Sequence, residues 1–244
     1  MMPAVTLADS CFCIIFAVHN QIKCNMKYRI LFFCLLCCMV AKAQIPYYAP
    51  TTGHGNLNGY TSLKFRPGVN AQETYTSFLL GLGDYATTGV DLYTCGKEVY
   101  SGLILRGGFM PSRYLGVGLQ VAPSFRTDEN MRFSFLTTGL FLNGDILNDG
   151  KLFWAANTWY TARRGMADDI DQYMYLGTNI PLPHGQTLTP MAGTIYSWRF
   201  NSDADLALGV YWSVGKFCFY LWGNDLLKAH PRMVVGLEFT IPAF

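Results

Sequence analysis

The stretch that decides the fold is PRMVVGLEFTIPAF, residues 231–244, at the end of the chain. Side chains of a β-strand point alternately to opposite faces, so residues two apart share a face. One alternating set is apolar throughout: Met233, Val235, Leu237, Phe239 and Ile241. The other set is small or polar: Val234, Gly236, Glu238 and Thr240. The pattern predicts a strand with one apolar face, which fits the edge strand of a soluble sandwich or the wall of a barrel.

The other end of the sequence has the features of a secretory signal peptide over residues 26–43. Lys27 and Arg29 precede an apolar run of eleven residues, 30–40, which ends shortly before an A-x-A cleavage site. That run is too short to cross a bilayer as a helix, which takes about 20 apolar residues. We therefore expect secretion of the mature chain.

Cleavage after Ala43 would make Gln44 the mature N-terminus, and residues 1–25 would be a mis-called upstream extension. The competing interpretation is a lipoprotein signal that ends at Cys37 or Cys38, although neither is preceded by the small residue that such signals carry. Loss of residues 1–43 would remove six of the eight cysteines and leave 14 Lys and Arg against 15 Asp and Glu, a net charge of −1. This composition argues against a disulfide scaffold and against nucleic acid as a partner.

Short β segments separated by turn residues follow a loop-like lead-in at residues 44–58. Turn residues occur at 111–113, 148–150, 183–185, 201–203 and 215–216. The spacing of about 17 residues per strand and turn exceeds the 8–12 typical of sandwiches and fits tilted membrane strands. The twelve predicted strands are 59–66, 73–83, 85–95, 98–110, 113–124, 131–143, 151–162, 171–180, 186–200, 204–214, 216–223 and 232–241.

The less apolar face of these strands distinguishes a membrane barrel from a soluble sheet. A soluble sheet would carry Lys, Glu and Arg there, whereas this chain carries mainly Gly, Ala, Ser, Thr and Tyr. Many aromatic residues fall near predicted strand ends, as in the interfacial girdles of membrane barrels. High β-propensity is the alternative explanation for them. The girdle candidates are Trp154, Trp159, Tyr160, Tyr173, Tyr175, Tyr196, Trp198, Tyr220 and Trp222.

The mature sequence offers no catalytic set. Its histidines, His54, His184 and His230, fall outside the predicted strands and form no pair at metal-ligand spacing. Glycine pairs such as Gly107-Gly108 do not open a helix, so they are not phosphate loops. We expect neither an enzyme nor a bound cofactor or metal.

The signal peptide, the alternating strands and the terminal Phe together resemble a Gram-negative outer-membrane β-barrel. The resemblance implies an all-β, closed antiparallel up-and-down barrel of about 12 strands (10–14), residues 59–244, in the outer membrane. It also implies a barrel-assembly signal at Phe239, Ile241 and Phe244, although Pro242 puts Phe244 out of phase with the apolar face. Its partners would be outer-membrane lipid and the barrel-assembly machinery.

Both chain ends would then be periplasmic, which places Cys95 and Cys218 at opposite ends of the barrel. A disulfide needs Cα atoms within about 7 Å, so both cysteines are predicted to be free.

Size and the Tyr-, Gly- and Trp-rich strands are loosely similar to PorP/SprF-like barrels of type IX secretion and gliding, although the Asn-Pro-Ala-type motif of that family is missing. This similarity implies secretion-system proteins as partners. The connections include no long extracellular or plug loop, which favours a structural or assembly role. The alternative is a passive pore or transporter for small solutes or hydrophobic molecules. The predicted lumen-facing residues are Arg106, Gln120 and Glu238, of which Arg106 and Glu238 could pair inside a filled barrel.

Overall fold

The computed structural model describes residues 51–147, 150–198 and 203–243. Every described residue belongs to one compact unit of the chain. The predicted signal peptide, its cleavage site and Phe244 lie outside the described residues.

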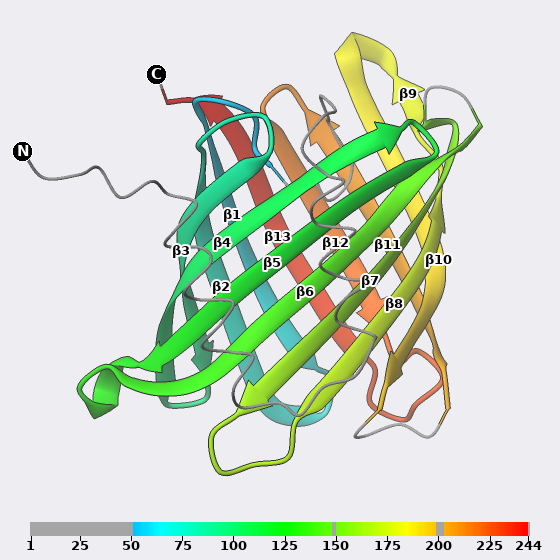
Figure 1. The fold of residues 1–244 in the computed structure, drawn as a ribbon. Coiled ribbons are helices and arrows are strands. Elements are labelled where there is room, and N and C mark those ends of the chain that lie inside the picture. Colours follow the sequence, from blue (N-terminus) through cyan, green and yellow to red (C-terminus); the bar gives the residue numbers. More distant parts are fainter. Residues whose placement is uncertain (1–50, 148–149, 199–202, 244) are drawn as a thin grey trace, which may run out of the picture. The chain divides into compact units, whose positions relative to one another are not determined.

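The described residues form one antiparallel sheet that closes on itself (Figure 1). The short β9 extends the wall position of β8, because both pair with β10 along different parts of its length. The wall therefore has twelve positions, and the predicted closed twelve-strand barrel is confirmed. The strands are β1 (Asn56–Arg66), β2 (Val69–Gly81), β3 (Ala86–Cys95), β4 (Glu98–Ser112), β5 (Leu115–Arg126), β6 (Arg132–Leu147), β7 (Leu152–Arg163), β8 (Asp169–Gly177), β9 (Ile180–Leu182), β10 (Gln186–Ser197), β11 (Asp205–Val214), β12 (Phe217–Asn224) and β13 (Arg232–Pro242).

The barrel closes where the last strand, β13, pairs with the first, β1. The pairing is continuous from Asn56 opposite Pro242 to Phe65 opposite Met233. Closure removes the free sheet edge, whose unpaired backbone groups would each cost several kcal/mol in hydrocarbon. We name the end with Asn56 and Pro242 the upper end, as it lies in Figure 1, and the opposite end the lower end.

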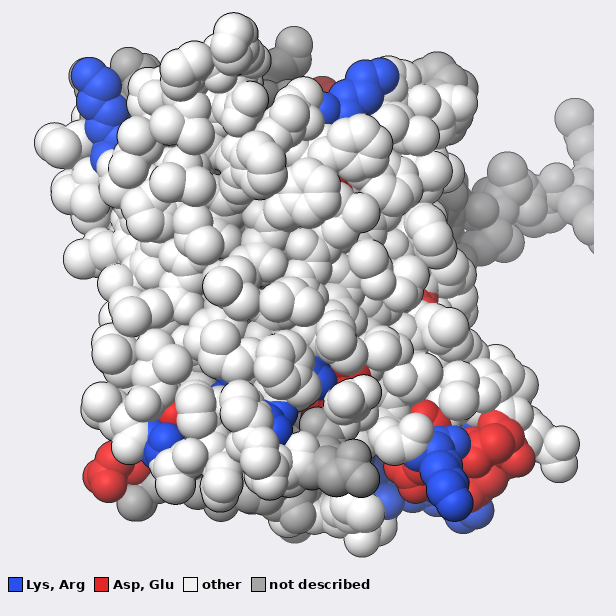
Figure 2. All heavy atoms as spheres, turned by 180° about the vertical axis from the view of Figure 1, so that it is seen from behind, with Lys and Arg blue, Asp and Glu red and all other residues white. Residues whose placement is uncertain are grey.

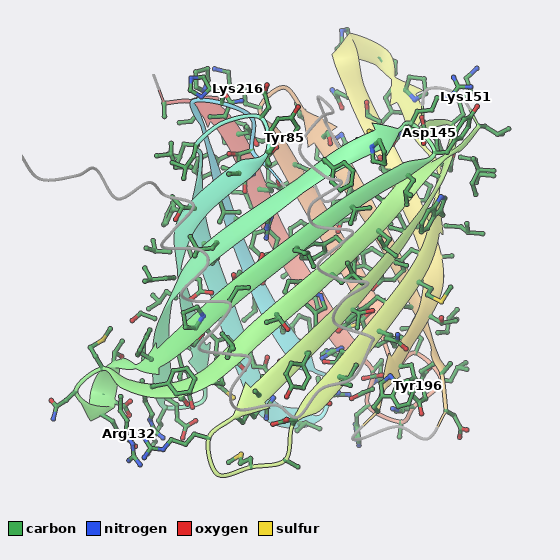
Figure 3. All side chains as sticks on the ribbon, in the orientation of Figure 1. Tyr85, Arg132, Asp145, Lys151, Tyr196 and Lys216 are labelled. Atoms are coloured by element: carbon green, nitrogen blue, oxygen red, sulfur yellow. The ribbon has the colours of Figure 1, made fainter. Side chains whose placement is uncertain are left out.

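Alternation along the strands separates an apolar outer wall from the inner one. On β4, Leu103 and Leu105 are 56% and 58% exposed on the outside, whereas Ile104 between them is fully buried inside. On the face shown in Figure 2, charged side chains gather toward the two ends, most densely at the lower end, and the band between them is nearly all uncharged. Figure 3 places Lys216, Asp145 and Lys151 at the upper end and Arg132 at the lower end.

Each of the twelve predicted segments overlaps one wall strand, but some bounds differ. β1 begins at Asn56, inside the predicted lead-in, because pairing with β13 continues to that residue. The turn predicted at 111–113 lies slightly later, at residues 113–114, because β4 runs through Pro111 to Ser112. The register shifts between Phe109 and Ser112, and such an irregularity lets a strand accommodate a proline.

The cysteines Cys95 and Cys218 are free, as predicted. Cys95 ends β3 at the lower end, and Cys218 lies near the start of β12 at the upper end. Over the described residues, helical structure consists of the 3-10 turns Thr127–Glu129 and Pro183–Gly185 and the 3-10 residue Gly150. None of the described helices has the length and apolar character needed to cross a membrane.

Candidate functional site: the barrel lumen

The lumen holds a cavity of about 1860 Å³. Its lining includes Thr187 and Ser213 at the upper end and Arg66 and Arg163 at the lower end. Because strand ends at both rims contribute, the cavity extends along the whole height of the wall. Within the described residues, no group of three or more His, Cys, Asp or Glu side chains is arranged to hold a metal ion.

All three predicted lumen residues line this cavity. Arg106 on β4 and Gln120 on β5 are cross-strand partners, and Gln120 is only 4% exposed. The Arg106 guanidinium donates to Gln120 Oε1 from Nε at 2.8 Å and from Nη2 at 2.5 Å. Its Cζ also lies 5.5 Å from the ring centroid of Phe141. Gln120 and Phe141 thus fix the position of a positive charge in the lumen.

Glu238 on β13 is held by the neighbouring strand β1. Asn58 Nδ2 donates to Glu238 Oε1 at 2.8 Å and also contacts Thr240 Oγ1 at 3.0 Å, so the closing seam orients the carboxylate. The ion pairs formed by described residues join other groups, and Arg106 lies four strands from Glu238 around the wall. The Arg106 guanidinium donates to Gln120, and Glu238 accepts from Asn58, so the direct pairing considered from the sequence is not formed.

The lower end carries networks of charge. Arg126 at the end of β5 contacts Glu98, Asp128 and Glu129 at 2.9–3.2 Å. A second network ties the connection at residues 225–231 to the wall, since Arg66 Nη2 lies 3.0 Å from Asp225 Oδ2 and Arg66 Nη1 donates to the His230 carbonyl at 2.7 Å. These contacts fix the shape of the lower mouth.

Asp128 in the connection after β5 provides a test of the first network. Its carboxylate accepts hydrogen bonds from Arg126 at 2.9 and 3.1 Å, and these bonds lower the pKa of Asp128 below its usual value. A carboxyl whose folded pKa is depressed adds stability above its unfolded pKa, and loses that contribution as the pH falls through the folded value. We expect Arg126→Gln to return the pKa of Asp128 to its ordinary range, measured by carboxyl NMR titration. An identical titration in both proteins would contradict this account.

Aromatic side chains fill much of the inner wall, which corrects the predicted girdle. The rings of five girdle candidates line the cavity instead: Trp159, Tyr173, Tyr175, Tyr220 and Trp222. Trp198 and Tyr160 are 61% and 36% exposed and point outward, as a girdle requires. These rings point inward because side chains alternate between the two faces of a strand, and each ring lies on the face that carries mainly small or polar neighbours. On β11, Tyr211 shares a face with Ala207, Gly209 and Ser213, and this signal is visible in the sequence.

The segment Thr51–Gly55 lies inside the upper end, which the sequence did not indicate. Thr52 N donates to Thr87 Oγ1 at 2.9 Å, and Gly55 N donates to the Gly81 carbonyl at 3.1 Å. A Cβ at Gly81 would overlap the Gly53 carbonyl, so a glycine is required for this approach. Thr51, Thr52 and Gly53 of this segment line the upper part of the cavity.

Comparisons with known proteins agree with this architecture. No family model matches the sequence, and no curated protein matches it. Among solved structures, the KdgM porin gives a TM-score of 0.54 at 7% identity over 75% of this chain and 98% of that chain. The KdgM porin in complex with disordered oligogalacturonate gives 0.53 at 7% identity, over 75% and 98% of the chains. The NanC porin gives 0.50 at 10% identity over 74% and 98%.

At these identities the comparisons establish the fold alone. KdgM and NanC are porins, and the resemblance to PorP/SprF-like barrels stays a prediction. The chain has the fold of a twelve-strand porin-like β-barrel, shared with KdgM and NanC.

Proposed function

We propose that this chain is an outer-membrane pore through which small hydrophilic solutes diffuse passively. The observation that carries the proposal is the cavity of about 1860 Å³, lined from both ends of a wall whose outer face is apolar. An apolar belt with a polar interior is the arrangement of transmembrane barrels that conduct solutes. The porin fold of the structural neighbours supports the same function.

The charge of the lining bears on which solutes pass. Ten Lys and Arg and eight Asp and Glu side chains line the cavity. The KdgM neighbour is described with oligogalacturonate, an acidic polymer, whose passage would be favoured by a strong excess of positive charge. The near balance here favours weak ion selectivity, with Arg106 and Glu238 as the opposed charges of the upper lumen.

The assembly role favoured by the sequence has less support than the pore. The assembly role was favoured because the connections include no long loop that could act as a plug. An open pore has no plug either, and the cavity lined from both ends of the wall fits an open pore. Secretion-system partners stay a prediction from the resemblance. For the pore, the proposed partners are outer-membrane lipid along the wall and the barrel-assembly machinery, with both chain ends periplasmic and the lower end outside.

Planar-bilayer recording of refolded protein tests the pore. Stepwise conductance increases should appear on insertion, because water and ions can occupy the lumen. Glu238→Gln removes a lumen anion, so the reversal potential in a salt gradient should shift toward anion preference. Inserted, heat-modifiable protein that leaves the membrane non-conducting would overturn the proposed function.

A further inference from the structure

Six lumenal tyrosines follow one another around the wall, with only β13 between two of their strands, from the lower mouth to the upper part of the barrel. All six line the cavity, and they belong to β4, β3, β2, β1, β12 and β11. In this order they are Tyr100, Tyr93, Tyr75, Tyr60, Tyr220 and Tyr211. We call them the tyrosine track.

Ring contacts connect the track into two runs. In the lower run, the centroids of Tyr93 and Tyr100 are 5.7 Å apart. In the upper run, Tyr60 lies 5.7 Å from Tyr75 and 5.5 Å from Tyr220. Tyr220 lies 5.3 Å from Tyr211. The runs meet where Tyr75 and Tyr93 are direct cross-strand partners, whose side chains lie on one face of the sheet.

A glycine makes the upper run continuous across the closing seam. β13 separates β12 from β1, and at the level of the track it carries Gly236, the cross-strand partner of Tyr220. A Cβ at Gly236 would overlap the Tyr220 hydroxyl, so the ring can lie across β13 only because this side chain is missing. Tyr220 thereby stacks on Tyr60 with an interplanar angle of 16°.

The phenol groups and their partners supply hydrogen-bonding groups along the same path. The Tyr75 hydroxyl donates to Asp91 Oδ2 at 3.2 Å, and the Tyr100 hydroxyl donates to Glu98 Oε2 at 2.5 Å. Tyr60, Tyr75, Tyr93 and Tyr211 are only partly buried, so their rings meet the cavity. A solute on the track would find flat apolar surface with polar groups beside it.

We propose that the tyrosine track binds a neutral oligosaccharide in transit through the lumen. A pyranose ring presents C–H groups on its faces and hydroxyls at its rim, so it can stack on a phenol ring while its rim hydrogen-bonds neighbouring polar groups. A track of several rings suits a chain of sugars more than one small solute. The near balance of lining charge favours a neutral saccharide over an acidic one. This inference rests on the proposed pore and names its substrate class.

The test adds a linear neutral glucose hexasaccharide to a bilayer that already contains conducting wild-type pores. We expect reversible, concentration-dependent block of the current. Tyr60→Leu should raise the half-blocking concentration roughly tenfold, the effect of losing one stacking contact, while Tyr60→Phe, which keeps the ring, should stay near wild type. Tyr160→Leu on the outer wall is the matched control and should leave the block unchanged. Tyr75→Leu serves as a second track variant if Tyr60→Leu does not form pores.

The outcomes separate this inference from the pore itself. Conducting wild-type pores that the hexasaccharide does not block would overturn the track and leave the pore intact. Stronger block by oligogalacturonate of equal length would overturn the neutral class, and block equal in wild type, Tyr60→Leu and Tyr75→Leu would overturn the role of the tyrosines. A membrane that never conducts would instead refute the proposed function.

Discussion

Replacing Leu237 by arginine should destabilise the barrel by about 2–4 kcal/mol, the cost of a basic side chain that faces lipid near the midplane. Leu237 lies in the middle of β13, opposite Thr61 on β1 and Phe219 on β12, and belongs to the outward set that includes the exposed Val235. The free energy of unfolding in lipid vesicles and the heat-modifiable fraction on gels measure the effect.

The neighbouring residue supplies the matched control. Glu238 faces the lumen, so Glu238→Gln should leave the folded yield at the wild-type level. Folded yields that are the same for wild type, Leu237→Arg and Glu238→Gln would mean that Leu237 does not face lipid, because a one-residue slip of register exchanges the two faces.

Truncation of Phe153 to alanine should destabilise the barrel by about 3–5 kcal/mol, the usual cost of removing a buried phenylalanine. Phe153 on β7 is 2% exposed and belongs to the inner cluster that includes Tyr175 and Met191. Its ring lies over Gly177 of β8, where a Cβ would overlap it. Urea unfolding of wild type and variant in the same vesicles gives the difference directly.

Phe153→Leu is the control for the packing account, since it keeps most of the volume and should cost under about 1.5 kcal/mol. Equal losses for alanine and leucine would show that aromatic contact, rather than filled volume, holds this part of the wall. No measurable loss for alanine would show that the inner cluster does not contribute to stability.

Much of the wall could be predicted because membrane barrels repeat one simple pattern. The alternation in residues 231–241 indicates a strand with one apolar face, and the same alternation at Leu103 and Leu105 predicts which side chains point outward. The same alternation predicts that Arg106, Gln120 and Glu238 lie on the polar face of their strands, and in the structure all three line the lumen. These features depend on residues two apart on one strand, which a single sequence displays.

Other features depend on pairs that the sequence does not reveal. Tyr60 and Tyr220 stack across β13 because the register places Gly236 beside Tyr220, and that register is set by the closed wall as a whole. The approach of Gly53 to Gly81 depends in the same way on tertiary structure. The girdle prediction was wrong for the five candidates that line the cavity, because it used nearness to strand ends. The alternation of faces along each strand places rings such as Trp159 and Trp222 in the lumen.

Cysteine labelling along β13 tests most directly the central claim, that one face of this strand lines a conducting lumen. Single cysteines would replace Glu238 or Thr240 on the inner face and Val235 or Leu237 on the outer face, in a Cys95→Ser, Cys218→Ser background. A charged, water-soluble thiol reagent should label positions 238 and 240 and reduce the single-pore current, and should leave 235 and 237 unlabelled with the current unchanged. Equal labelling of both sets, or labelling at 238 and 240 with no change in current, would contradict the claim.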